Sequence, residues 1–305
     1  MDILSVVLPI FLLIALGFVL RKTNVMKPEW VHIENSLVYS VGLPALIITS
    51  FWNVDWNTPG LLRLVGLNFL FLLGFALALG ILLALLPMNR RVKASIFLVG
   101  LVGNTIYMGF PLGMQAFGAE AASTVVGVGT LFLVFGIMVA IVGIEIFWQP
   151  ERLISYLKNF VKNPLILGVV AGVAVSFIHD TTGIAGIVRE TVGMIGALAS
   201  PLALIALGGF LFDRFDREVV WFATLATGIK LLAFPIVFFF VDILIGGGGV
   251  REVGVSMLLG AMPAAVTTLA VAEQFDLDQS LVASTVVVST VASVVTVPLV
   301  LSLWA

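Results

Sequence analysis

The chain has 305 residues and a formal net charge of −2; 61% of its residues are hydrophobic and only 10% are charged. A soluble domain usually carries about 25% charged residues, so this chain has too few to cover a surface exposed to water. This composition excludes a soluble enzyme, a nucleic-acid-binding domain and a disordered regulator. Because the sequence has no cysteine, it also excludes disulfides and cysteine-ligated metal sites. A polytopic helical membrane protein is the class that remains.

Apolar windows predict ten transmembrane helices with short loops, since each span needs about 20 apolar residues. In chain order the predicted spans are residues 3–20, 31–51, 60–86, 94–117, 121–146, 164–178, 186–212, 219–245, 252–274 and 280–304. Unpaired backbone groups are not tolerated in lipid, so these spans are expected to be helices rather than open strands. Arg21 and Lys22 follow the first span where a cleaved signal peptide would have small residues, so we interpret it as a retained helix.

Basic residues in the predicted loops set the expected orientation. Most Lys and Arg residues fall in odd-numbered loops, whereas the even-numbered loops and their edges carry only Arg63, Arg189 and Arg251. Positive loops tend to stay in the cytoplasm, so the odd-numbered loops are predicted to be cytoplasmic. Both termini are then expected outside the cytoplasm.

The fifth loop, residues 148–163, divides the chain into two groups of five predicted spans, residues 1–147 and 164–305. Leu153, Ile154 and Leu157 recur in it at helical spacing, which indicates an amphipathic helix on the cytoplasmic face. A plain linker between the halves is the alternative. An odd number of spans in each half gives the halves opposite orientations, which is the inverted repeat of many secondary transporters.

One helix in each half is punctuated by glycine and proline at a corresponding position. The fourth span contains residues 103–113 with Pro111, and the ninth contains residues 260–268 with Pro263. Proline and glycine both weaken a helix, and a helix interrupted inside lipid exposes N–H and C=O groups that can bind ions. The alternative is that both helices are merely kinked. Two interruptions that meet at the membrane midplane would make an anion site and a neighbouring cation site.

Polar residues near these interruptions are the candidate binding groups. The candidate substrate-binding residues are Asn104, Thr105, Pro111, Lys230, Pro263, Thr267 and Thr268. The candidate ion-coupling residues are Gln115, Glu145, Glu273 and Gln274. Several have structural alternatives: Asn104 can cap freed backbone, the threonines can bond their own helix, and the long Lys230 side chain can reach toward the membrane edge. In a functional role, Lys230 could attract the anion or pair with a carbonyl cluster at an interruption. The two histidines lie near span ends on opposite sides of the membrane, so no metal site and no cofactor are predicted.

The run Gly103-Asn104-Thr105-x-x-Met108-Gly109-x-Pro111-Leu112 resembles the fourth-helix signature of the auxin efflux carrier (PIN-like) family. Other parts of the chain are similar to the same family. These are Leu8–Phe11, Leu43–Ala45, Pro201–Leu204 and Met262-Pro263. The resemblance therefore covers the whole chain, and the fourth-span run is its most specific part.

This resemblance implies a bacterial inner-membrane protein with a ten-helix, five-plus-five inverted repeat like that of bile-acid/sodium symporters. Helices 1, 2, 6 and 7 would form a scaffold, and helices 3–5 and 8–10 would form a transport domain that moves like an elevator. The resemblance also implies a homodimer and an organic-anion substrate, either an auxin-like monocarboxylate or a dicarboxylate such as malonate or malate. One departure is that the third span has no acid and Asn68 is its most polar residue, so a proton mechanism is not carried over.

The leading hypothesis is therefore a secondary carrier of a small organic anion. A sodium-coupled symporter of the same fold is the first alternative, and a non-transporting membrane receptor is the second. No paired acids, histidine cluster or nucleophile–base set indicates an enzyme. The sequence leaves open the substrate, the direction of transport and whether protons, sodium or no ion drives it.

Overall fold

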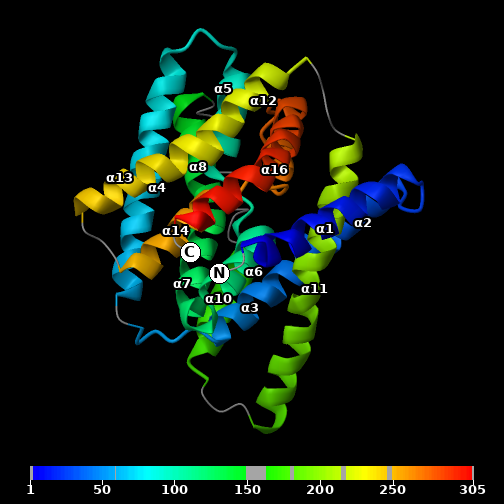
Figure 1. Cartoon of the computed structure of the whole chain (residues 1–305), viewed down its shortest axis with the longest axis vertical. Helices are drawn as coiled ribbons and strands as arrows, with labels where there is room; N and C mark the ends of the chain where they lie inside the picture. Colours follow the sequence, from blue (N-terminus) through cyan, green and yellow to red (C-terminus); the bar gives the residue numbers. More distant parts are fainter. Residues whose placement is uncertain are drawn as a thin grey trace. The chain divides into compact units, whose positions relative to one another are not determined.

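The computed structural model describes residues 3–58, 60–148, 163–178, 182–213, 218–245 and 249–303 (Figure 1). Over these residues the protein is helical, with one isolated antiparallel bridge between Gly103 and Ala264. The helices of the first half are α1 (Ile3–Lys22), α2 (Pro28–Leu37), η1 (Val38–Gly42), α3 (Leu43–Trp52), α4 (Leu61–Leu85), α5 (Arg90–Leu101), η2 (Thr105–Gly109), α6 (Phe110–Phe117), η3 (Ala119–Ala121), α7 (Ala122–Thr130), η4 (Leu131–Phe135) and α8 (Gly136–Phe147).

The second half of the chain follows residues 149–162, which lie outside the described residues. Its helices are α10 (Pro164–Ser176), α11 (Gly183–Asp213), α12 (Val220–Gly228), η5 (Ile229–Ala233), α13 (Phe234–Ile245), α14 (Val250–Gly260), α15 (Thr268–Gln274) and α16 (Gln279–Ser302). The predicted amphipathic helix falls on residues 149–162, outside the described residues.

The all-helical fold predicted from composition is confirmed over the described residues. A helical segment lies at each predicted span, and the predicted fourth and ninth helices are interrupted. Within the described residues, six helices are long and apolar enough to cross a membrane, and the segments 38–52 and 164–176 are shorter apolar helices. The count of ten crossings and the inverted repeat stay predictions.

Among the described residues, four helices contain a π-helical turn, in which the backbone hydrogen bonds skip one extra residue. These turns are η1, η2, η4 and η5. Such turns are frequent at functional sites because they shift the direction of the side chains that follow. One of them, η2, lies in the interrupted fourth helix, and another, η5, carries the buried Lys230.

Side chains of the loops fix where several helices begin. Asn89 accepts a hydrogen bond from the Arg91 N–H at 2.9 Å at the start of α5, and Asp278 accepts one from the Leu281 N–H at 2.9 Å at the start of α16. These caps pair N–H groups that have no partner inside the helix. At the other end of the interrupted fourth helix, Gly118 adopts a φ of 74°, which suits glycine and ends α6.

The contacts divide the chain into two compact units. One comprises residues 1–8, 60–153 and 213–305, and the other comprises residues 9–59 and 154–212. The first therefore holds α4 to α8 and α12 to α16, with both interrupted helices. The second holds most of α1, together with α2, η1, α3, α10 and α11.

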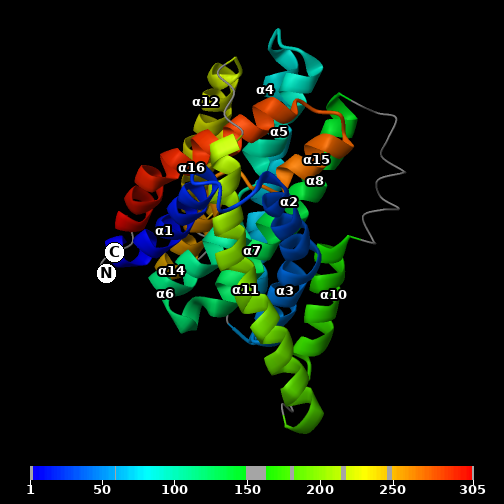
Figure 2. The same ribbon diagram turned by 90° about the vertical axis from the view of Figure 1, so that its right-hand side faces the viewer.

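Glycine allows helices to approach closely in the second unit. A Cβ atom on Gly17 of α1 would lie 1.9 Å from the Ile205 carbonyl oxygen of α11, and one on Gly208 would lie 1.9 Å from the Ile14 carbonyl oxygen. α3 and α10 lie side by side (Figure 2), and a Cβ atom on Gly168 would lie 2.9 Å from the Cα of Pro44. Close backbone contact through small residues is a common way for helices to associate in lipid.

The first unit packs around an aromatic cluster next to the interruptions. The ring of Phe234 lies 5.0 Å from Phe71, 4.8 Å from Phe75 and 5.5 Å from Phe132, all edge to face. Such pairs stabilise a core beyond the area that they bury. The cluster joins α4, η4 and α13, so it gives Lys230 of the adjoining turn η5 an apolar surrounding.

Replacement of Gly208 by alanine should destabilise the protein, because the new Cβ atom would overlap backbone atoms that cannot rotate away. We expect the free energy of unfolding to fall by about 1–3 kcal/mol, as it does when other protein cores are overpacked. The measurement is the melting temperature of the purified protein in detergent. Gly74→Ala on α4 is the matched control, since nothing lies within 4 Å of its added Cβ atom. Equal melting temperatures for the two variants would contradict the close crossing of α1 and α11.

Candidate functional site

The two interrupted helices meet inside the first unit. α5 ends at Leu101 and α14 ends at Gly260, and the chain between each of them and the next helical segment is not helical. The Asn104 N–H donates to the Pro263 carbonyl at 2.7 Å, and the Ala265 N–H donates to the Val102 carbonyl at 3.1 Å. The two segments therefore pair reciprocally, and each satisfies backbone groups that the other has exposed.

Side chains from neighbouring helices pair with backbone groups that this crossing leaves over. The buried Ser289 hydroxyl of α16 accepts a hydrogen bond from the Ala264 N–H at 3.1 Å. The Lys230 ammonium donates to the Gly260 carbonyl at 2.9 Å, at the end of α14. Buried polar groups are costly unless they are hydrogen-bonded, so these contacts stabilise the interrupted backbone.

Lys230 is held deep within the first unit. Its residue is 1% exposed, and its Nζ lies 4.2 Å from the centre of the Phe234 ring. Of the roles considered from the sequence, the structure places it in contact with a carbonyl group at an interruption. A contact with substrate remains a proposal.

Asn104 lies at the centre of the crossing with a side chain that is not fully hydrogen-bonded. The residue is 2% exposed, and its Nδ2 has no hydrogen-bond acceptor among the described residues. The backbone carbonyl oxygen of Asn104 accepts hydrogen bonds from the Met108 and Gly109 N–H groups and so starts the turn η2. A buried amide donor without a partner costs about 1–3 kcal/mol, which a bound acceptor would recover.

The other predicted residues of the first interruption have structural positions. The Thr105 hydroxyl donates to the Gly129 carbonyl at 2.9 Å and so links the interruption to α7. Pro111 lies in the first turn of α6, where the missing N–H of proline is tolerated. Both hold the segment around Asn104 in place.

The predicted residues of the second interruption differ in whether their polar atoms have a hydrogen-bond partner. Pro263 is buried, and its carbonyl accepts the bond from Asn104. The Thr268 hydroxyl donates to the Ala265 carbonyl at 2.6 Å, as hydroxyls in membrane helices often do. The buried Thr267 Oγ1, in contrast, has no hydrogen-bond partner among the described residues. The crossing therefore offers two unpaired polar atoms, one on each interrupted segment.

The four candidate ion-coupling residues are not gathered at the crossing. Gln115 is exposed near the end of α6, and Glu273 and Gln274 are exposed at the end of α15. Glu145 is 1% exposed and lies in α8.

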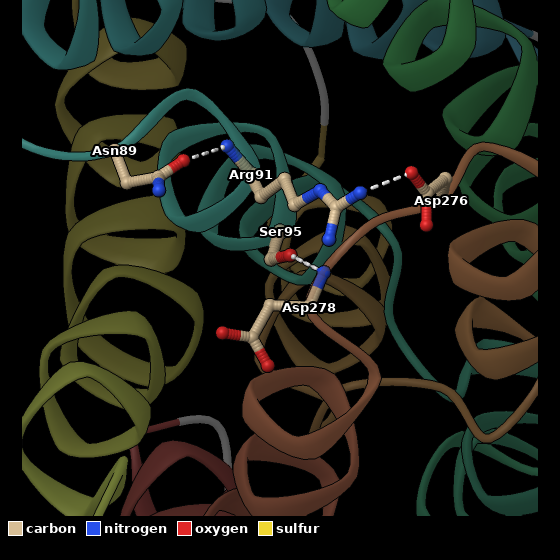
Figure 3. A network of polar contacts seen from close by, with 5 residues as sticks. All are labelled: Asn89, Arg91, Ser95, Asp276 and Asp278. Carbon is tan, nitrogen blue, oxygen red and sulfur yellow. Dashed lines mark hydrogen bonds and ion pairs between the residues drawn. The ribbon is translucent and has the colours of Figure 1, made fainter.

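Ion pairs join the outer ends of the interrupted helices. Arg91, near the start of α5, pairs with Asp276 in the turn after α15 (Figure 3). The Ser95 hydroxyl also accepts a hydrogen bond from the Asp278 N–H at 3.0 Å in this network. Arg251, near the start of α14, pairs in the same way with Glu120 in the turn after α6. An exposed ion pair contributes less than about 1 kcal/mol to the free energy of unfolding. These pairs therefore show that the ends of the two interrupted helices lie close together, but they add little stability.

Two buried hydroxyls near these helices were not predicted from the sequence. One is Ser289, and the other is Ser256 of α14, whose Oγ accepts a hydrogen bond from Asn68 Nδ2 at 3.1 Å. A signal for Ser289 was present, because Thr285, Ser289 and Ser293 recur every four residues in an apolar helix. Such spacing places hydroxyls on one face of the helix.

Comparisons with known proteins agree with the membrane protein that the composition predicts. A family model described as "Membrane transport protein" matches residues 2–161 and 149–301. The chain is 27% identical to an uncharacterized transporter of Methanothermobacter thermautotrophicus over 301 residues, 96% of this chain and 95% of the relative. It is 26% identical to an uncharacterized transporter of Methanocaldococcus jannaschii over 307 residues, 99% and 97% of the two chains. It is also 26% identical over 311 residues to a protein of Rhizobium meliloti named as a candidate malonate transporter, 97% and 94% of the two chains.

Replacement of Ser289 by alanine should weaken the crossing, because the Ala264 N–H would lose its acceptor in a buried position. We expect a loss of about 1–3 kcal/mol in the free energy of unfolding, measured as a lower melting temperature in detergent. Ser302→Ala is the matched control, since the Ser302 hydroxyl is exposed on the same helix and bonds only its own backbone at Leu299. If both variants melted like the wild type, Ser289 would not support the interruption.

Proposed function

Because this chain belongs to the membrane transport protein family, we propose that it is a secondary transporter of a small organic anion and that the anion binds where the interrupted helices cross. Its family and its named relatives are transporters, so the protein is a multi-pass membrane transporter and not an enzyme. The finer assignments below are part of the proposal.

The observation that carries the proposal is the buried, unpaired amide of Asn104. Its Nδ2 donor and the unpaired Thr267 Oγ1 lie on the two segments of the crossing, and both are shielded from water. A carboxylate has oxygen atoms that accept such hydrogen bonds, and the nearby Lys230 ammonium favours a negative charge. A small carboxylate therefore fits the chemistry of this site better than a cation or a neutral solute.

A dicarboxylate such as malonate or malate is the substrate class that we favour, and an auxin-like monocarboxylate is the alternative within the same class. The relative from Rhizobium meliloti, with its name as a candidate malonate transporter, supports the first choice. The remaining candidates, Thr105, Pro111, Pro263 and Thr268, would then shape the site through the backbone that they hold.

We assign the transport movement to the unit that contains both interruptions. The division of the chain into two compact units supports this, since all of α4 to α8 and α12 to α16 lie in one of them. In this proposal the other unit is a scaffold, through which two copies form a homodimer, and the transport unit carries the anion across by an elevator movement. The excess of basic residues in odd-numbered loops supports an orientation with both termini outside the cytoplasm. The bacterial inner membrane is the location that the family resemblance implies.

A thermal-shift screen of purified protein against carboxylates tests the substrate class. A ligand that binds only the folded protein at 100 times its dissociation constant stabilises it by about 2.7 kcal/mol, so malonate or malate should raise the melting temperature clearly. Uptake of the same labelled carboxylate into proteoliposomes must follow. Neutral analogues such as malonamide are the control. Stabilisation by malonamide as strong as that by malonate would argue against an anion site.

Replacement of Asn104 by alanine should weaken carboxylate binding while the protein stays folded. A hydrogen bond to a charged group contributes about 1.5–3 kcal/mol, so the affinity should fall by at least about tenfold. Binding is measured by calorimetry, and folding by the melting temperature without ligand. Asn57→Ala is the control, because Asn57 is an exposed asparagine in a loop. Unchanged affinity in the Asn104 variant would place the substrate elsewhere.

A further inference from the structure

We propose that Tyr107 limits the size of the carboxylate that binds at the crossing. Its aromatic ring occupies the place beside Asn104 that the ring of an aromatic carboxylate would need, so the site takes a small aliphatic acid and rejects an aromatic one. This inference rests on the proposed function, because it concerns the same site. It also decides between the two substrate classes considered there, in favour of the dicarboxylate.

Tyr107 belongs to the interrupted segment itself. It lies in the turn η2, three residues after Asn104 and so within one turn of it. The residue is 6% exposed, so its ring is covered by protein. An aromatic side chain buries about 150–250 Å² of surface, so this ring takes up much of the space next to the turn. Tyr107 was not among the candidates chosen from the sequence.

Other residues of this segment hold it against neighbouring helices. The Thr105 hydroxyl donates to the Gly129 carbonyl of α7 at 2.9 Å. The Phe110 ring packs on the same glycine, since a Cβ atom on Gly129 would lie 2.4 Å from Phe110 Cε1. A Cβ atom on Gly109 would lie 2.7 Å from Leu259 Cδ2 of α14. The side of the segment that carries Thr105, Gly109 and Phe110 is therefore fixed against α7 and α14.

Tyr107 lies on the opposite side of the same turn. It is two residues after Thr105 and two residues before Gly109. Residues two apart in a helical turn do not face the same way, because two residues make about half a turn. The Tyr107 ring therefore leaves the segment away from the contacts with α7 and α14. A change at Tyr107 alters the space beside Asn104 and leaves those contacts in place.

Close packing makes such a ring a filter for size. Protein interiors are filled to a density of about 0.74–0.76, so a second ring cannot enter the place that the Tyr107 ring occupies. Malonate has no ring and needs no such place. Even one extra methylene group in an apolar pocket changes discrimination by about 10–200-fold, so a whole phenyl ring should cost at least as much.

The first test compares two dicarboxylates on the wild-type protein. Phenylmalonate is malonate with one added phenyl ring, so the pair differs in size and keeps both carboxylates. Calorimetry on the purified protein in detergent should give malonate an affinity at least about tenfold higher than that of phenylmalonate. Equal affinities would overturn the size filter.

The second test removes the ring. In Tyr107→Ala the phenyl group of phenylmalonate can enter the vacated place, because an apolar cavity in a protein binds aromatic molecules. The affinity for phenylmalonate should rise at least about tenfold over that of the wild type, while the affinity for malonate stays nearly unchanged. Tyr107→Leu, which empties less space, should show a smaller gain in the same direction and serves if the alanine variant does not fold.

Phe110→Ala is the matched control, since it removes a ring from the other side of the same segment. Toluene, which has no charge, should raise the melting temperature of both alanine variants by filling either cavity. Phenylmalonate should gain affinity only for Tyr107→Ala, where its carboxylates can still reach Asn104. Adding Asn104→Ala to Tyr107→Ala should remove that gain and keep the response to toluene. An equal gain of phenylmalonate affinity in Phe110→Ala would place the filter elsewhere.

The outcomes separate this inference from the proposed function. If the wild type binds neither malonate nor malate, the proposed function fails and the inference falls with it. If the wild type binds malonate and a folded Tyr107 variant gains no affinity for phenylmalonate, the inference alone is overturned. The comparison on the wild type requires no variant, so it still decides the question if none of the variants folds.

Discussion

A main chain that leaves the helix inside a membrane must find partners for its own N–H and C=O groups, and this constraint organises the unit that contains both interruptions. The two interrupted segments solve it mostly for each other, through the bonds from Asn104 to Pro263 and from Ala265 to Val102. Ser289 and Lys230 then pair with the Ala264 N–H and the Gly260 carbonyl. Asn104 Nδ2 and Thr267 Oγ1 stay without a partner among the described residues, and for that reason we place the ligand there.

The sequence alone was sufficient to predict the helices and the positions of both interruptions. Long apolar windows and the glycine and proline runs at residues 103–113 and 260–268 have direct physical effects on the local backbone, so they could be interpreted without tertiary information. The bridge between Gly103 and Ala264 could be expected only in outline, as two interruptions that meet. Its register depends on how distant helices pack, which no local pattern encodes.

At the candidate site, too, the sequence does not show which individual side chains are already hydrogen-bonded within the protein. Asn104 was chosen because it adjoins an interruption, and the structure gives it the buried, unpaired amide that a binding role requires. Thr105 and Thr268 were chosen for the same reason, yet their hydroxyls already bond Gly129 and Ala265. A hydroxyl looks alike in the sequence whether it faces a ligand or a carbonyl. Only the packing of helices such as α7 distinguishes the two.

The reciprocal pairing also constrains how the protein is made. Val102 and Asn104 leave the ribosome long before Pro263 and Ala265, so during synthesis the first interrupted segment has not yet met its partner. Until the later residues arrive, these backbone groups need water, another protein or the edge of the insertion machinery. The first interrupted segment therefore cannot complete its backbone hydrogen bonds until the second has been synthesised.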